Sequence, residues 1–244
     1  MTTDLPELVR TGQVASAAAM DPTDGTLTGA DGLTRCWWCG GDPLYVAYHD
    51  REWGRPLRDE RALFELLCLE GFQAGLSWIT ILRKRVSFRE AFEGFDVSSV
   101  ARYDEADILR LLANPGIVRH RGKITATIAN AQAIEAMRDA GTSLKQIVWS
   151  HAPLARDEPL AHRLDVPPQT PESAELVRAL RKWGMRFVGP TTVYAFMQSA
   201  GVVDDHLAAC HRAGAGGATR RKGPRPAPPI PGPLKRPRKA KTSG

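Results

Sequence analysis

Helical periodicity is the feature that most constrains the fold of this chain. Apolar residues recur at helical spacing in several segments, and residues that favour helix ends flank them. Asp59 is suited to cap a helix running toward Glu70, and Asp104 to cap one running through Ala113. Further helices are expected over 121–138, from Thr170-Pro171 to Gly184, and over 190–200 before Gly201. Convincing strands of alternating polarity joined by hairpin turns are absent, so the sequence predicts an all-α fold.

Composition narrows the class of protein. The chain has 244 residues, 43% of them hydrophobic, and no apolar run long enough to cross a bilayer. Its first residues lack the basic and apolar regions of a signal peptide. We therefore expect a cytosolic protein that has no membrane partner and needs no nucleotide cofactor, and nothing in the sequence requires more than a monomer. In a reducing compartment the four cysteines are expected to be thiols or metal ligands rather than disulfides.

Charge divides the chain into three parts. From Arg212 onward there are ten Lys and Arg and no acid, which leaves 23 basic and 27 acidic residues, a net charge of −4, before that point. The Pro- and Gly-rich basic segment 214–244 cannot bury a core and is expected to be a disordered, weakly nucleic-acid-binding arm. An acidic leader, 1–34, is also expected to be disordered. The folded domain is expected to span 35–213.

Glu70 interrupts an apolar helix face. It follows Leu63, Leu66 and Leu67 at i, i+3, i+4 and i+7 spacing, where a hydrocarbon is expected. An unpaired buried carboxylate is costly, so Glu70 either caps a neighbouring helix, bonds a buried backbone N–H, or serves a ligand. Aromatic residues are concentrated around it in the sequence, and core packing alone is the alternative explanation for them. They are Trp37, Trp38, Tyr45, Tyr48, Trp53 and Trp78. Together with the acid they favour a pocket for a flat, electron-poor ligand.

Two histidine and cysteine groups indicate a metal site. His206 and Cys210 have the spacing that places both side chains on one face of a helical turn, and Cys36, Cys39 and His49 are candidates to complete a tetrahedral zinc site. Spacing alone slightly favours Cys36 with Cys39. Four protein ligands leave no open position for water, so such a zinc would be structural and would tie the two ends of the domain together.

Two turns carry candidate phosphate contacts. The segment 184–191 joins two helices, and Gly189 and the backbone N–H groups that follow it are free to face an anion, although a plain helix end explains the glycine equally well. The segment 116–123 concentrates four cationic or titratable groups, which either touch a backbone phosphate or lie in a solvated loop.

Several segments together resemble bacterial 3-methyladenine DNA glycosylase I, the Tag-type family. They are RCWW (35–38), DPLYVAYHDREWG (42–54), LFELLCLEGFQAGLSWITIL (63–82), GIVRHRGKI (116–124) and RFVGPTTVYAFMQSAGVVDDH (186–206), followed by Cys210. They occur in the family's order across roughly 35–211. The resemblance implies an all-α domain of the helix-hairpin-helix glycosylase superfamily, with a zinc site that joins its N- and C-terminal ends.

The resemblance also implies roles for individual residues. It assigns the structural zinc to Cys36, His49, His206 and Cys210, which favours His49 over Cys39, while a cysteine at position 39 departs from the family and leaves a local ligand exchange open. Glu70 matches the catalytic pocket carboxylate that contacts the excised base. The pocket aromatics are Trp38, Tyr45, Tyr48, Trp53 and Trp78. The DNA-anchoring hairpin 184–192 contributes Arg186, Val188, Gly189 and Thr191.

The implied reaction is removal of 3-methyladenine from double-stranded DNA after the base leaves the stack. The N3-methylated base is cationic and leaves readily, and Glu70 with an aromatic face favours it over neutral adenine. The first acids after the hairpin are Asp204 and Asp205, beside a zinc ligand, and no lysine is placed as a Schiff-base nucleophile. We expect a monofunctional enzyme that leaves an abasic site. The rival hypotheses are a zinc-containing module that only senses damage, and a tether whose main function lies in the basic tail.

Overall fold

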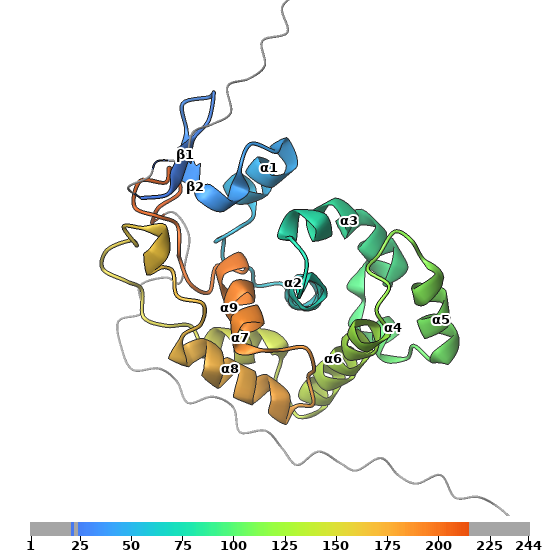
Figure 1. Ribbon diagram of the computed structural model, residues 1–244. Coiled ribbons are helices and arrows are strands. Elements are labelled where there is room, and N and C mark those ends of the chain that lie inside the picture. Colours follow the sequence, from blue (N-terminus) through green and yellow to red (C-terminus); the bar gives the residue numbers. More distant parts are fainter. Residues whose placement is uncertain (1–20, 22–23, 215–244) are drawn as a thin grey trace, which may run out of the picture.

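The computed structural model describes residue 21 and residues 24–214. Most of the expected leader and nearly all of the expected basic tail lie outside these residues. The described part is mostly helical, as predicted, with one small hairpin and short 3-10 turns (Figure 1). In chain order the elements are β1 (Thr26–Thr28), β2 (Thr34–Cys36), η1 (Trp37–Cys39), α1 (Pro43–Arg51), α2 (Glu60–Gln73), α3 (Trp78–Ala91), η2 (Glu93–Phe95), α4 (Val97–Ala101), α5 (Glu105–Ala113), α6 (Arg121–Asp139), α7 (Leu144–Ser150), η3 (Arg163–Asp165), α8 (Pro171–Lys182) and α9 (Pro190–Ser199).

The helix ends follow local chemistry. The Asp59 carboxylate accepts a hydrogen bond from the Ala62 N–H at 2.8 Å and starts α2, and Asp104 starts α5 in the same way. At the end of α9, Gly201 has a φ of +64°, and a Cβ there would lie 2.4 Å from the Arg55 carbonyl carbon. Only glycine fits both the backbone conformation and this close approach. The five helices expected from the sequence are therefore confirmed.

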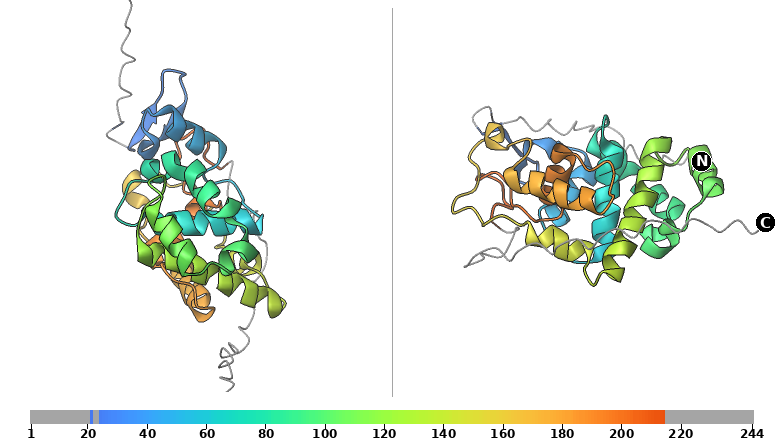
Figure 2. Two further views of the ribbon diagram at one scale, coloured as in Figure 1. Left: turned by 90° about the vertical axis from the view of Figure 1, so that its right-hand side faces the viewer. Right: turned by 90° about the horizontal axis from the view of Figure 1, so that it is seen from below.

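Helix α2 lies at the centre of the domain. It packs against α3, α6, α7 and α9, and Figures 1 and 2 show the other helices arranged around it. Phe64 and Phe72 on α2 are fully buried, and the Phe72 ring lies 4.7 Å from that of Phe88 on α3. The central position explains why one face of α2 is apolar almost to its end. It also means that a polar group on that face is enclosed by other helices.

A two-stranded antiparallel hairpin departs from the all-α prediction. Strands β1 and β2 pair Thr26 with Cys36, so residues expected in the leader belong to the described structure. The hairpin lies beside the C-terminal segment, where the His211 N–H donates to the Thr34 carbonyl at 2.8 Å. Each strand has only three residues, too few for the alternation that identifies strands in sequence. Within the described residues, no helix is long and apolar enough to cross a membrane.

Candidate active site and metal centre

A cavity of about 200 Å³ lies where η1, α1, α2, α3 and α9 meet. The five aromatic residues expected in the pocket all line it, together with Glu70 and seven residues to which the family resemblance gave no pocket role. The complete lining is Trp37, Trp38, Tyr45, Tyr48, Trp53, Glu70, Gln73, Trp78, Val166, Ala195, Gln198, Ser199 and Asp205. A small cavity walled by aromatic rings matches the dimensions and chemistry of a single flat heterocycle.

Glu70 is the buried carboxyl group of this cavity. Its exposed fraction is 4%, and its Oε1 accepts a hydrogen bond from the Ser199 hydroxyl at 2.8 Å. Burial raises the pKa of Glu70 to about 8, and the hydrogen bond from Ser199 lowers it in part. Within the described part of the chain, Glu70 neither caps a helix nor accepts from a backbone N–H. Near pH 7 the empty pocket therefore favours the neutral carboxyl, whereas a bound cation would favour the ionised form.

The aromatic walls carry hydrogen-bond donors without partners. Among the described residues, the Tyr48 hydroxyl and the Trp78 indole N–H are buried and make no hydrogen bond. The Tyr48 and Trp78 rings are 5.5 Å apart and tilted, while Trp38 lies edge-on to Trp53 at 4.9 Å. Buried donors of this kind cost free energy unless a ligand satisfies them. Two orphan donors beside an acid are thus consistent with a polar, planar guest.

A second hollow of about 300 Å³ adjoins the first. Tyr48, Trp78 and Ser199 line both, but Glu70 lines only the smaller one. The larger hollow is instead bordered by ion pairs such as Arg85 with Glu52, whose shorter contact is 2.5 Å. Both of its acids, Glu52 and Glu65, are paired with arginines, so it offers no unpaired carboxylate, and size alone does not identify the reactive pocket. The smaller cavity is the better candidate, because of the two it is the one lined by the buried carboxyl group of Glu70.

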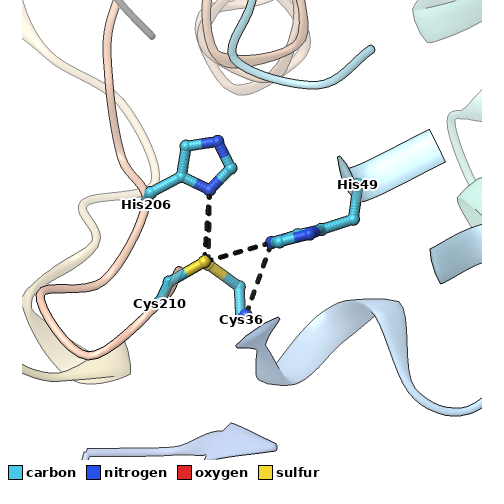
Figure 3. A group of neighbouring side chains, drawn as sticks. All are labelled: Cys36, His49, His206 and Cys210. Atoms are coloured by element: carbon cyan, nitrogen blue, oxygen red, sulfur yellow. Dashed lines mark hydrogen bonds between the residues drawn. The ribbon is translucent and has the colours of Figure 1, made fainter. Parts of the chain in front are cut away.

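Four side chains from opposite ends of the domain form a buried cluster. Cys36, His49, His206 and Cys210 bring one ligand atom each to within 4.8 Å of the others, and Figure 3 shows them facing a common centre. The Cys210 sulfur lies 3.5 Å from His49 Nε2 and 3.7 Å from His206 Nδ1. A tetrahedral zinc site with bonds of 2.0–2.3 Å has ligand-to-ligand distances of about 3.5 Å. The donor set therefore fits a metal ion of this kind.

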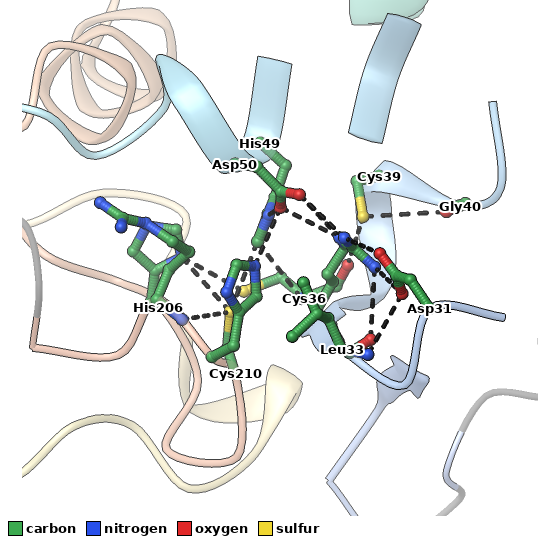
Figure 4. Close-up of polar contacts among 12 residues, drawn as sticks. Asp31, Leu33, Cys36, Cys39, Gly40, His49, Asp50, His206 and Cys210 are labelled. Carbon is green, nitrogen blue, oxygen red and sulfur yellow. Dashed lines mark hydrogen bonds and ion pairs between the residues drawn. The ribbon is translucent and has the colours of Figure 1, made fainter. Parts of the chain in front are cut away.

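The surroundings of the cluster orient its ligands. His49 Nδ1 lies 2.8 Å from Asp50, which also pairs with Arg35 at 2.8 Å, so Nε2 is the nitrogen that faces the cluster (Figure 4). Cys39 points elsewhere, because its thiol donates to the Cys36 carbonyl at 3.2 Å and its sulfur is outside the four-residue group. The geometry thus selects His49 over Cys39, as the family resemblance implied and as spacing alone did not.

The Cys36 and Cys210 thiols of the cluster shift each other's pKa. The hydrogen bond between them raises the pKa of Cys36 and lowers that of Cys210. One thiol is therefore ready to ionise without a metal, and a bound dication would favour the thiolate at both.

The turn 184–191 joins α8 to α9. The Asn130 side chain bonds the backbone of this turn. It accepts from the Arg186 N–H at 2.8 Å and donates to the Arg186 carbonyl at 3.2 Å. Val188 is buried, whereas the side chains of Arg186 and Thr191 are exposed. In the described structure no side chain caps the start of α9 at Gly189, and the N–H groups of its first turn have no intrahelical partner.

The segment 116–123 has mainly structural contacts. The Lys123 ammonium group is buried and donates to the Phe72 and Ala74 carbonyls at 2.8 and 2.6 Å, which closes the C-terminal end of α2. His120 caps the start of α6, and Arg121 pairs with Glu105 at 2.8 Å. Of the four groups singled out in the sequence, only Arg119 is exposed without such a contact in the described structure.

Comparisons with known proteins give a family for the chain. The family model for methyladenine glycosylase matches residues 38–213. The chain is 48% identical over 180 residues to DNA-3-methyladenine glycosylase of Haemophilus influenzae, covering 72% of this chain and 96% of that protein. It is 47% identical over 181 residues to DNA-3-methyladenine glycosylase 1 of Escherichia coli, covering 73% and 96%.

Solved structures show the same similarity. A crystal structure of a 3-methyladenine DNA glycosylase I matches with a TM-score of 0.71 and 49% identity, over 73% of this chain and 99% of that one. A tyrosine-to-phenylalanine variant of a 3-methyladenine DNA glycosylase I, in complex with 3-methyladenine, matches with a TM-score of 0.67 and 39% identity, over 70% and 92%.

Proposed function

Because the chain belongs to the methyladenine glycosylase family, we propose that its aromatic cavity is the pocket in which 3-methyladenine is excised from alkylated DNA. The enzyme is a DNA glycosylase and acts in DNA repair. Glu70 is the catalytic carboxyl group, and Trp38, Tyr45, Tyr48, Trp53 and Trp78 form the walls around the base. The observation that carries this assignment is a buried acid whose only hydrogen-bond partner among the described residues is one hydroxyl group.

Recognition depends on the charge of the lesion. Methylation at N3 gives the base in DNA a positive charge, and a buried carboxylate beside aromatic faces binds a flat cation better than neutral adenine. Since the pKa of Glu70 is about 8 in the empty pocket, entry of the cation displaces the proton. Neutral adenine gives no such gain and leaves the carboxyl group protonated.

Cleavage then needs little acid catalysis. The flipped, cationic base is a good leaving group, and the ionised Glu70 accepts from its edge as the N-glycosidic bond breaks. Water adds to the sugar and leaves an abasic site. Among the residues that the structure describes, no lysine lines the pocket, which supports a monofunctional reaction without a Schiff base.

We assign a structural zinc ion to Cys36, His49, His206 and Cys210. Four protein ligands leave no place for substrate, so the ion contributes stability rather than chemistry. The site joins residue 36 to residue 210 and so restrains a loop of nearly the whole domain. Within this proposal, the catalytic domain spans 35–213 with the short hairpin attached to it.

The turn between α8 and α9 is assigned to the DNA backbone, as in a helix-hairpin-helix. Its support is the free helix start at Gly189, the exposed Arg186 and Thr191, and the buried Val188 that holds the turn in place. Backbone N–H groups at a helix start bind phosphate without reading the base sequence. The preferred substrate is accordingly double-stranded DNA.

The test is incubation of the purified protein with methylated duplex DNA, followed by chromatographic identification of the released bases. Release of 3-methyladenine with formation of alkali-labile sites is expected. Binding of methylated DNA without base release would instead support the damage-sensing module. Deleting 213–244 should leave release unchanged at moderate salt, whereas loss of release would favour the tail as the functional element. A DNA adduct trapped with borohydride would contradict the monofunctional mechanism.

A further inference from the structure

We infer that Gln198 is a specificity-determining residue whose side-chain carbonyl oxygen accepts from the exocyclic amine of the base and so disfavours methylated bases that carry a 6-oxo group. This inference rests on the proposed function, because it concerns the same pocket. It goes further by naming the chemical group that the pocket reads besides positive charge.

The orientation of the Gln198 amide is set by one neighbour. Gln198 is half-buried in the pocket wall, and its Nε2 donates to Asp205 Oδ2 at 2.8 Å. Asp205 forms an ion pair with Arg156, and the carboxylate of such a pair accepts hydrogen bonds, so the amide nitrogen of Gln198 faces Asp205. The amide oxygen is then the end left over, and in the described structure no protein donor reaches it. The Gln198 amide could otherwise offer a ligand either a donor or an acceptor, but with its nitrogen bound to Asp205 it offers only the acceptor.

Asp205 is itself held in place. Its side chain is fully buried, and it accepts from the Tyr194 hydroxyl at 2.6 Å and from the Arg156 guanidinium. With donors at both oxygens, the carboxylate cannot rotate to release Gln198 without breaking an ion pair. The four side chains come from α9, the segment after it, and the loop before α8. Their arrangement explains why the acceptor has a fixed direction.

The chemistry of the purine edge follows directly. 3-Methyladenine has a 6-amino group with two N–H donors, whereas 3-methylguanine and 3-methylhypoxanthine have a 6-oxo acceptor. A 6-oxo group opposite a carbonyl oxygen leaves two acceptors facing each other without a hydrogen, and a site built for a donor rejects such an analogue strongly. 3-Methyladenine and 3-methylguanine are both cationic in DNA. Charge therefore cannot separate them, but this contact can.

The experiment compares release of 3-methyladenine and 3-methylguanine from one preparation of methylated DNA. The wild-type protein is expected to favour 3-methyladenine, and Gln198→Leu is expected to reduce that preference about ten-fold or more, chiefly through slower release of 3-methyladenine. Gln132→Leu is the matched control, because Gln132 is an exposed amide on α6 that donates to the Ala101 carbonyl outside the pocket. The control should keep the wild-type preference.

A second measurement needs no variant. Tryptophan fluorescence of the wild-type protein titrated with free 3-methyladenine and free 3-methylhypoxanthine should show at least ten-fold weaker binding of the oxo compound. Equal affinities, or an unchanged base preference in a folded and active Gln198→Leu protein, would overturn the inference while leaving the glycosylase intact. A wild-type protein that releases neither base would instead show failure of the proposed function.

Discussion

The base pocket and the Cys/His cluster both bury polar groups, but the two regions differ in the partners that these groups have. In the cluster, each side chain turns one ligand atom toward the other three, and Asp50 and Arg35 support it from outside, while His206 Nε2, which is not needed as a ligand atom, has no hydrogen-bond partner in the described structure. In the pocket, Glu70 has one partner, and the donors of Tyr48 and Trp78 have none in the described structure. Buried polar groups that are satisfied contribute to stability, whereas unsatisfied ones cost stability until a ligand arrives. The Cys/His cluster is therefore suited to stabilising the fold, and the base pocket to binding a ligand.

Metal removal is the change with the largest expected effect on this comparison. A zinc chelator, or Cys210→Ser, should lower the free energy of unfolding by more than about 5 kcal/mol, because the ion closes nearly the whole domain. Chemical denaturation and zinc analysis measure it. Cys39→Ser is the control and should retain stoichiometric zinc, since the Cys39 thiol bonds the Cys36 carbonyl instead. Equal stability with and without chelator would show that the cluster is not a metal site.

In the pocket, we expect removal of a polar group to stabilise the fold rather than destabilise it. Burial raises the pKa of Glu70 from 4.5 to about 8, so the folded state binds an extra proton between these values and loses stability as the pH rises through 8. Glu70→Gln cannot ionise and should be more stable than wild type above pH 8, by up to about 5 kcal/mol. Below pH 4.5 the two proteins should be nearly equal. Denaturation curves at pH 4, 7 and 9 test this, and a variant less stable at every pH would indicate that Glu70 is a structural residue.

Glu70→Gln, which should stabilise the fold at high pH, should reduce activity. Glu70→Gln is expected to slow release of 3-methyladenine about 100-fold, equivalent to about 2.7 kcal/mol of transition-state stabilisation. The amide keeps the size of the side chain but not its charge. Single-turnover release from methylated DNA gives the rate, and unchanged excision by the stable variant would remove Glu70 from the mechanism.

The smallest expected effect is that of substituting Ser199, the residue that donates to Glu70. Ser199→Ala removes the hydroxyl that donates to Glu70 at 2.8 Å, which should raise the pKa of Glu70 further and cost about 1 kcal/mol in base release. The pH profile of excision should move to higher pH. Ser150→Ala, which removes a hydroxyl that bonds the Ile147 carbonyl, is the control and should not shift the profile. An unshifted profile for Ser199→Ala would mean that Glu70 does not titrate in the reaction.

Local sequence determined much of the fold. Helices α2, α5, α6, α8 and α9 were predicted because capping residues and apolar spacing act within a few residues of one another. Helices α1, α3, α4 and α7 were not predicted. Helices α4 and α7 have only one or two turns, which give too little periodicity, whereas α1 and α3 are longer and were missed for lack of a clear apolar face. The hairpin was missed because its strands have three residues each. The interruption of an apolar face by Glu70 was also visible in the sequence, and so was the aromatic concentration around it.

Tertiary structure alone decided the partners. Ser199 meets Glu70 across 129 residues of sequence, and Asp205 faces Gln198 only because the segment after α9 folds back beside it. The choice of His49 over Cys39 likewise depends on where α1 places the imidazole, not on spacing. Periodicity and capping are short-range effects that a sequence displays directly, whereas a pair of side chains that satisfy each other is defined by distance in space. The chemistry of this site therefore became specific only when the helices were packed.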